Sequence, residues 1–120
     1  MLKIQEYMSQ GFTPVYTDGA SQPPRGLLPR VGGYGVFFGD GSGFSSPIPQ
    51  SEPQTNNRGE LRGALHALQT TPHDTKLLLI SDSKYVVGGL LGGAHKWKRN
   101  GWRCSTGEAQ HADLWNKILP

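Results

Sequence analysis

Three acidic residues in separate segments of the chain have the types and positions expected of a metal site. Asp18 and Asp82 each follow an apolar stretch that predicts a strand, and Glu60 is predicted in the first turn of a helix. Carboxylate oxygens are ligands that Mg²⁺ prefers, and two such ions about 3.5–4 Å apart can promote in-line phosphoryl transfer. Because these element ends could meet at one edge of a sheet, we expect the carboxylates to form a two-metal site for Mg²⁺ or Mn²⁺.

Each of these acids also has an ordinary structural interpretation. Asp18 is typical of a turn, Asp82 of a helix cap and Glu60 of a negative charge near a helix N-terminus. For any single residue both interpretations stay open. The metal site is favoured by the combination of the three acids with Asn56 and Asn57, which precede Glu60, and with a basic segment further along the chain.

The basic segment spans residues 96–103. The chain has 12 Lys and Arg against nine Asp and Glu, a formal net charge of +3, and Lys96, Lys98, Arg99 and Arg103 fall in this segment. Trp97 and Trp102 alternate with these cations. Cations that contact phosphates and rings that stack on bases are typical of nucleic-acid binding. The alternative is a solvated loop whose tryptophans complete the hydrophobic core.

The apolar pattern predicts the elements that must position these groups. Strands are predicted over 13–17, 32–38, 43–46 and 77–80. Helices are predicted from a Thr55 or Asn56 cap to Thr70, from Lys84 to Leu91 and from Ala109 to Leu119. The continuous apolar run 77–80 is typical of a parallel strand that is buried on both faces. This order of elements indicates a mixed α/β class around one sheet.

The length of 120 residues allows one domain with a modest core. Residues 1–12 show no clear period and are predicted to be an irregular lead-in to a single domain over 13–120. No apolar run approaches the roughly 18 residues that cross a membrane, and the start lacks the pattern of a secretory signal. We therefore expect an intracellular location and no membrane partner. The single cysteine, Cys104, excludes an internal disulfide.

Six motifs resemble the ribonuclease H family, type 1, in their order and spacing. They are Tyr16–Gly19 (YTDG), Gly32–Gly35 (GGYG), Thr55–Leu61 (TNNRGEL), Ser81–Val86 (SDSKYV), Trp97–Trp102 (WKRNGW) and Ala112–Trp115 (ADLW). The resemblance implies a ribonuclease H-like mixed sheet with strand order 3-2-1-4 and helices on both faces. It also implies metal-dependent hydrolysis of the RNA strand of an RNA/DNA hybrid.

The same resemblance implies roles for individual residues. Asp18, Glu60 and Asp82 match three of the family's four catalytic carboxylates. The residues implied in nucleic-acid binding are Asn56 and Asn57 in the minor groove of the hybrid, Thr55 and His111 in a pocket for a DNA phosphate, and Trp97, Lys98, Arg99 and Trp102 in a basic protrusion. His111 stands where the family commonly has an asparagine.

The chain departs from the family pattern at its end. Pro120 precedes the positions of the family's fifth strand and of its last helix, which carries the fourth acid. We therefore expect a C-terminally incomplete domain, and a second chain is one source of the missing strand and helix. The leading hypothesis is an endoribonuclease acting on RNA/DNA hybrids, which the three acids favour. The alternative, favoured by the missing fourth acid, is a catalytically inactive ribonuclease H-like module of a ribonucleoprotein.

Overall fold

The computed structural model describes residues 2–23, 26–104, 107–108 and 110–119. In chain order the elements are α1 (Leu2–Ser9), β1 (Thr13–Gln22), β2 (Val31–Phe38), β3 (Gly43–Pro47), α2 (Asn56–Thr70), β4 (Leu77–Ile80), α3 (Lys84–Gly88), the π-helical turn η1 (Gly89–Gly93), α4 (Ala94–Arg99), β5 (Arg103–Cys104), β6 (Gly107–Glu108) and α5 (Ala112–Ile118). Within these ranges no helix has both the length and the apolar character that crossing a membrane requires.

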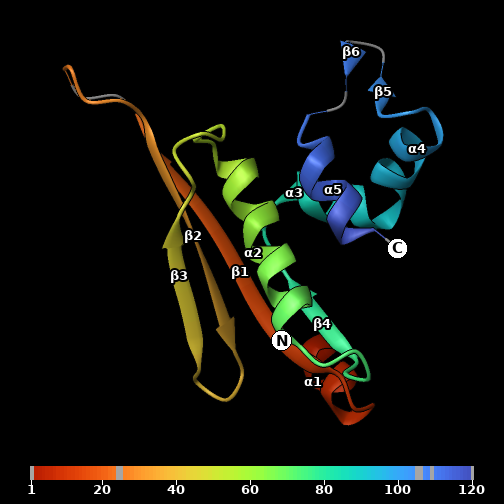
Figure 1. Ribbon diagram of the computed structural model, residues 1–120. Coiled ribbons are helices and arrows are strands. Elements are labelled where there is room, and N and C mark those ends of the chain that lie inside the picture. The colour runs from red at the N-terminus through yellow and green to blue at the C-terminus, as the bar shows by residue number, and fades with distance from the viewer. Residues whose placement is uncertain (1, 24–25, 105–106, 109, 120) are drawn as a thin grey trace.

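The main sheet has four strands in the order β3-β2-β1-β4, as predicted. The strand β2 pairs antiparallel with β1 and β3, whereas β4 pairs parallel with β1 (Figure 1). Helices lie on both faces, also as predicted, but the coverage is unequal. The helix α2 runs along β1 and β2, whereas Tyr16 and Phe37 on the other face are 43% and 52% exposed.

The helix α2 begins and ends where its capping residues predict. Thr55 has extended backbone angles, and its hydroxyl accepts a hydrogen bond from the Arg58 amide at 3.1 Å, as an N-cap does. Apolar residues recur at Leu61, Ala64 and Leu65, which puts one buried face against the sheet. The helix ends at the Thr71 cap, just ahead of a proline.

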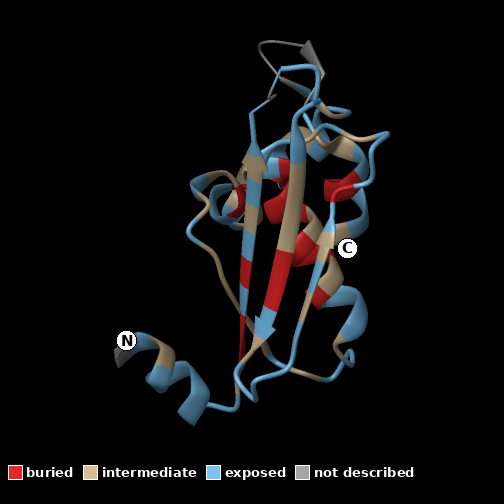
Figure 2. Ribbon diagram, turned by 90° about the vertical axis from the view of Figure 1, so that its left-hand side faces the viewer, coloured by how far each residue is buried: buried red, intermediate tan, exposed pale blue. Residues whose placement is uncertain are grey.

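Two clusters of buried residues hold α2 in place. Val15, Val36 and Ala67 pack between the helix and the sheet. The second cluster joins α2 to the helical half of the chain and consists of Leu61, Leu65, Val86, Ala94, Leu114, Trp115 and Leu119. In Figure 2 the buried segments lie mainly where the strands and helices meet. The core therefore fixes α2 against β1 on one side and against α3 and α5 on the other.

Two expectations for the first part of the chain are wrong. Residues 2–9, predicted to be irregular, form helix α1, although the division of the chain at residue 12 remains a prediction. The strand β1 continues to Gln22 because β2 pairs with it residue by residue, from Val15 opposite Phe38 to Gln22 opposite Val31. This pairing outweighs the turn propensity of the segment. Asp18 therefore lies within a strand and not at its end.

Further corrections concern the second half of the chain. Glu60 is the fifth residue of α2 and lies beyond its first turn. The helix predicted over 84–91 is interrupted after Gly88 by η1. The start of the predicted basic loop, up to Arg99, is helical and forms α4. The strand β4 is only partly buried at every residue, because it is an edge strand with one sheet neighbour among the described residues.

Candidate active site

The three predicted carboxylates converge in the fold. Asp18 comes from β1, Glu60 from α2 and Asp82 from the turn that follows β4, and carboxylate oxygens of the three lie within 4.8 Å of one another. Asp18 and Asp82 are exposed, whereas Glu60 is 4% exposed. One buried and two exposed acids thus form a cluster that is open to solvent.

Two hydrogen bonds hold the buried Glu60 carboxylate. The Gly19 amide donates to Oε1 at 3.0 Å, and the Ser81 hydroxyl donates to Oε2 at 3.2 Å. Burial raises the pKa of the Glu60 carboxyl above its ordinary value. The two hydrogen bonds lower it, and the charges of Asp18 and Asp82 raise it further. The carboxylate is therefore positioned by two neutral donors, the Gly19 amide and the Ser81 hydroxyl.

The donor set fits a hard divalent cation. Mg²⁺ binds oxygen ligands at about 2.1 Å, so opposite ligands of one ion are roughly 4.2 Å apart. The observed limit of 4.8 Å between the three acids is close to that span and also suits two ions that share ligands. A cation would relieve the repulsion that the three charges exert on one another. Asp18, Glu60 and Asp82 are therefore the residues that could hold such ions.

The predicted asparagines share a pocket with the acids. This pocket has a volume of about 380 Å³ and is lined by Asp18, Gly19, Asn56, Asn57, Glu60, Asp82, Ser83, Lys84 and Tyr85. Asn56 and Asn57 are exposed on the first turn of α2, four and three residues ahead of Glu60. Amide donors and acceptors therefore stand beside the acidic cluster, as expected for a site that holds a polar polymer.

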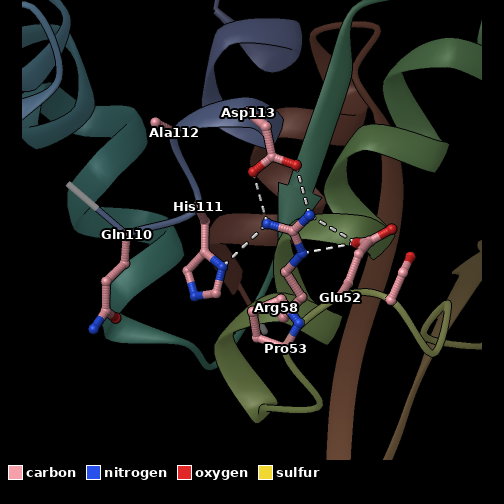
Figure 3. A pocket seen from close by; sticks show the side chains of 8 residues that line it. Glu52, Pro53, Arg58, Gln110, His111, Ala112 and Asp113 are labelled. Carbon is pink, nitrogen blue, oxygen red and sulfur yellow. Dashed lines mark hydrogen bonds and ion pairs between the residues drawn. The ribbon is translucent and has the colours of Figure 1, made fainter. Parts of the chain in front are cut away.

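A buried arginine organises a second pocket next to the start of α2. Arg58 is 4% exposed, and its Nη atoms donate to the two carboxylate oxygens of Asp113 at 2.8 and 2.6 Å (Figure 3). Its Nε donates to Glu52 at 2.8 Å, and Glu52 also pairs with Arg62. The hydrogen bonds from Arg58 hold the pKa of Asp113 down at about 2. Sequence reasoning missed this cluster because nothing local links residues so far apart.

His111 lies in this second pocket and not among the acids. Its Nδ1 is 3.3 Å from Nη1 of Arg58. Arginine can only donate, so Nδ1 is the acceptor and the ring proton of neutral His111 is on Nε2. Burial, and then the charge of Arg58, lowers the pKa of His111. The pocket has a volume of about 610 Å³ (Figure 3), and Thr55 is not among its lining residues.

The basic segment divides into exposed cations and packed rings. Lys98 and Arg99 are exposed on α4. Trp97 stacks on Tyr85 with ring centroids 6.1 Å apart, and both Trp97 and Trp102 pack against the core that includes Trp115. Both rings are partly buried and have packing partners in the core, and their stacking on nucleic-acid bases remains a prediction. Tyr85 also lines the acidic pocket, so the segment adjoins the site through that ring.

Comparisons with known proteins agree with this arrangement. A family model described as RNase H matches residues 11–119. Ribonuclease H of Dinoroseobacter shibae is 38% identical over 109 residues, covering 86% of this chain and 67% of that protein. Ribonuclease HI of Synechocystis is 38% identical over 108 residues, covering 88% of this chain and 65% of that protein.

A solved structure supports the same fold. The foamy viral protease-reverse transcriptase in complex with dsDNA superposes with a TM-score of 0.71 at 19% identity, covering 88% of this chain and 70% of that one. The chain spans about two thirds of the length of the two bacterial relatives.

Proposed function

Because this chain belongs to the ribonuclease H family, we propose that it hydrolyses the RNA strand of RNA/DNA hybrids in a reaction that depends on Mg²⁺ or Mn²⁺. The observation that carries the proposal is the convergence of Asp18, Glu60 and Asp82 within 4.8 Å of one another. These residues come from three elements that are far apart in sequence. Three acids brought together at a repulsive cost favour a working metal site over an inactive module.

The chain's own carboxylates would hold the metal ions. Asp18 and Asp82, both exposed, are accessible to ions from solvent, while the buried Glu60 is held by Gly19 and Ser81. Bound divalent ions would supply Lewis-acid stabilisation of the attacking and leaving oxygens of the phosphodiester. The carboxylates fix where the scissile phosphate can sit, because they determine the position of the positive charge.

The asparagines would recognise the hybrid. Each side-chain amide of Asn56 and Asn57 offers a donor and an acceptor, which suits base edges in a minor groove. Their position beside Glu60 brings the same pocket close to a ribose 2′-hydroxyl, the group that distinguishes RNA from DNA. We propose that these two residues and Glu60 account for selection of the RNA strand.

Thr55 and His111 would contact a phosphate of the DNA strand. Glu52 and Asp113 neutralise Arg58, so the arginine offers little net attraction for an anion. Two neutral donors remain. One is the Nε2–H of His111, and the other is the hydroxyl proton of Thr55, whose oxygen already accepts a hydrogen bond from the backbone amide of Arg58. Such donors support a phosphate contact of modest strength. The exposed Lys98 and Arg99 would add the electrostatic attraction.

The catalytic proposal is tested with Asp18→Asn. The substitution removes a metal ligand and a repulsive charge, so folding should be retained while cleavage of a labelled hybrid is lost and binding of the hybrid largely persists. Calorimetric titration with Mg²⁺ and Mn²⁺ should show weaker binding than in the wild type. Asp74→Asn, at an exposed acid outside the site, is the control. Equal metal affinities in Asp18→Asn and the wild type would refute the site.

The basic segment is tested with Lys98→Ala and Arg99→Ala. Each lost phosphate contact should reduce the slope of log affinity against log salt concentration by about 0.9. The matched control is Lys3→Ala on α1, at the other end of the molecule (Figure 1). Hybrid affinity is measured by fluorescence anisotropy over a range of salt concentrations in a cleavage-inactive background. If the salt dependence of hybrid affinity is unchanged in both variants, Lys98 and Arg99 make no phosphate contacts and the segment is a solvated surface.

A further inference from the structure

The hydroxyl of Ser81 links the Glu60 carboxylate to the turn that carries Asp82. Ser81 follows β4 directly and precedes Asp82, and its side chain is partly buried. Its Oγ lies 3.2 Å from Oε2 of Glu60 and accepts a hydrogen bond from the Ser83 amide at 3.1 Å. One hydroxyl therefore contacts both the turn that carries Asp82 and the carboxylate of Glu60.

The direction of these hydrogen bonds is determined by their partners. An amide N–H can only donate, so the Ser81 oxygen accepts from Ser83. The carboxylate of ionised Glu60 can only accept, so the Ser81 proton points at Oε2. A bond from a hydroxyl to an ionised group is stronger than a bond between neutral groups. With the Gly19 amide on Oε1, the two oxygens of Glu60 are oriented by one donor from β1 and one from the turn after β4.

The turn around Asp82 is closed by the same hydroxyl. The Ser83 amide reaches back over Asp82 to Ser81, and the Ser83 hydroxyl accepts from the Val86 amide at 3.2 Å as the N-cap of α3. The backbone on both sides of Asp82 is thus fixed. The hydrogen bond from the Ser81 hydroxyl to Glu60 connects this turn to α2.

We propose that Ser81 is a positioning residue that sets the spacing between the Glu60 and Asp82 carboxylates and so determines the affinity of the acidic cluster for divalent cations. This inference rests on the function proposed above. Outer hydrogen-bond partners of metal ligands typically change metal affinity or activity by about 10–100-fold when removed. Without the hydroxyl, the Gly19 amide is the one remaining donor to the Glu60 carboxylate among the described residues, so Glu60 can rotate away from Asp82.

The test compares Ser81→Ala with Ser81→Thr, which keeps a hydroxyl. Mn²⁺ and Mg²⁺ affinities are measured by calorimetry on the free protein, alongside thermal unfolding and the kcat and KM for hybrid cleavage. Ser81→Ala should bind the metals about tenfold more weakly and lower kcat, with the KM for the hybrid unchanged. Ser81→Thr should restore metal affinity to within about twofold of the wild type. Ser45→Ala, an exposed serine on β3, is the control.

A second measurement separates positioning from a general structural role. In a Glu60→Ala background, Ser81→Ala should no longer change metal affinity, because the partner of the hydroxyl is gone. An effect of the same size in that background would overturn the proposal, as would unchanged affinity in Ser81→Ala. Loss of cooperative unfolding in both Ser81 variants would also overturn it. If Asp18→Asn weakens metal binding but Ser81→Ala does not, only the positioning role fails; if neither does, the proposed function fails.

Discussion

Arg58 shows how a charge that takes no part in the proposed chemistry can still shape the site. A buried guanidinium is costly unless it is fully paired, and here Glu52 and Asp113 supply the pairing. Asp113 comes from α5, whereas Arg58 lies in the first turn of α2, directly after Asn56 and Asn57. The ion pairs therefore tie the turn that carries the asparagines to the last helix.

Removing one partner of this arginine should be destabilising. Asp113→Asn keeps the shape of the side chain but loses its charge. We expect a loss of about 1–2 kcal/mol in the free energy of unfolding at pH 7, at the lower end for a charged hydrogen bond. The loss is limited because the Asp113 side chain is 62% exposed and Glu52 continues to pair with Arg58. Urea denaturation of the variant and the wild type measures the difference.

The difference between variant and wild type should also depend on pH. An aspartate in an unfolded chain has a pKa of about 3.9, whereas Arg58 holds the pKa of Asp113 in the fold at about 2. A lowered folded pKa gives stability that is fully present above the unfolded pKa. It is lost as the pH falls through the folded pKa.

The gap in unfolding free energy between wild type and Asp113→Asn should therefore shrink as the pH falls from about 4 to 2. The raised pKa of Glu60 makes the fold more stable as the pH falls, which is the opposite effect. Glu60 is present in both proteins, so its contribution cancels in the difference between their unfolding free energies. Asp74→Asn should stay within about 0.5 kcal/mol of the wild type throughout. A gap that stays constant down to pH 2 would exclude the ion pair as its cause.

At the scale of elements, the site depends on how closely α2 approaches β1. A Cβ added to Gly59 would lie 2.6 Å from the Gly33 carbonyl oxygen and 3.1 Å from the Gly19 Cα. The backbones of α2 and β1 are therefore in direct contact at Gly59 and Gly19. This contact brings the Glu60 carboxylate within hydrogen-bond distance of the Gly19 amide. Gly19 and Gly59 both occur in the motifs that predicted the site, but only the fold shows that these two residues are in contact.

Gly59→Ala should separate the helix from the strand. The clash is with backbone atoms that cannot rotate away, and overpacking of this kind costs about 1–3 kcal/mol, which outweighs the gain of about 1 kcal/mol from replacing glycine in a helix. We expect lower thermal stability together with weaker metal binding, because Glu60 moves with the helix. Gly88→Ala, where nothing lies within 4 Å of the added Cβ, should instead be neutral or stabilising. Equal effects of the two substitutions would contradict the close contact.

The elements that could be predicted from the sequence are those whose signals are local. The hairpin between β2 and β3, the caps of α2 and the apolar strand β4 all have neighbouring residues that determine them. The extension of β1 to Gln22 depends on pairing with β2, and the start of α4 is read locally as a basic loop. The three acids could be predicted as a site because their motifs are specific. Gly19, Ser81 and Arg58 could not be given roles, because their partners lie 41, 21 and 55 residues away.

At the scale of the whole molecule, a row of apolar residues crosses the face of the sheet opposite α2. Tyr16 lies in register with Phe37 on β2 and with Ile80 on β4. Tyr16 and Phe37 are 43% and 52% exposed, and β4 is an edge strand among the described residues. An exposed apolar face beside an open edge favours association with another chain.

We expect residues 1–120 to self-associate as their concentration rises. Tyr16→Thr and Phe37→Thr keep good strand formers and remove apolar area, so each should shift the protein toward the monomer. Leu91→Ser, at a leucine that is 83% exposed outside the sheet, is the control and should change little. Size-exclusion chromatography with light scattering over a hundredfold concentration range measures the mass.

A wild-type chain that stays monomeric over that range would contradict this prediction. The sequence-based hypothesis that a second chain supplies a further strand and helix remains a prediction, and it makes a distinguishable claim. A different polypeptide that covered the row of Tyr16, Phe37 and Ile80 would suppress self-association. If it also carried the fourth carboxylate, cleavage of the hybrid would rise with it. Self-association of this chain alone would cover the row without adding an acid, so its mass would increase while its cleavage activity stayed the same.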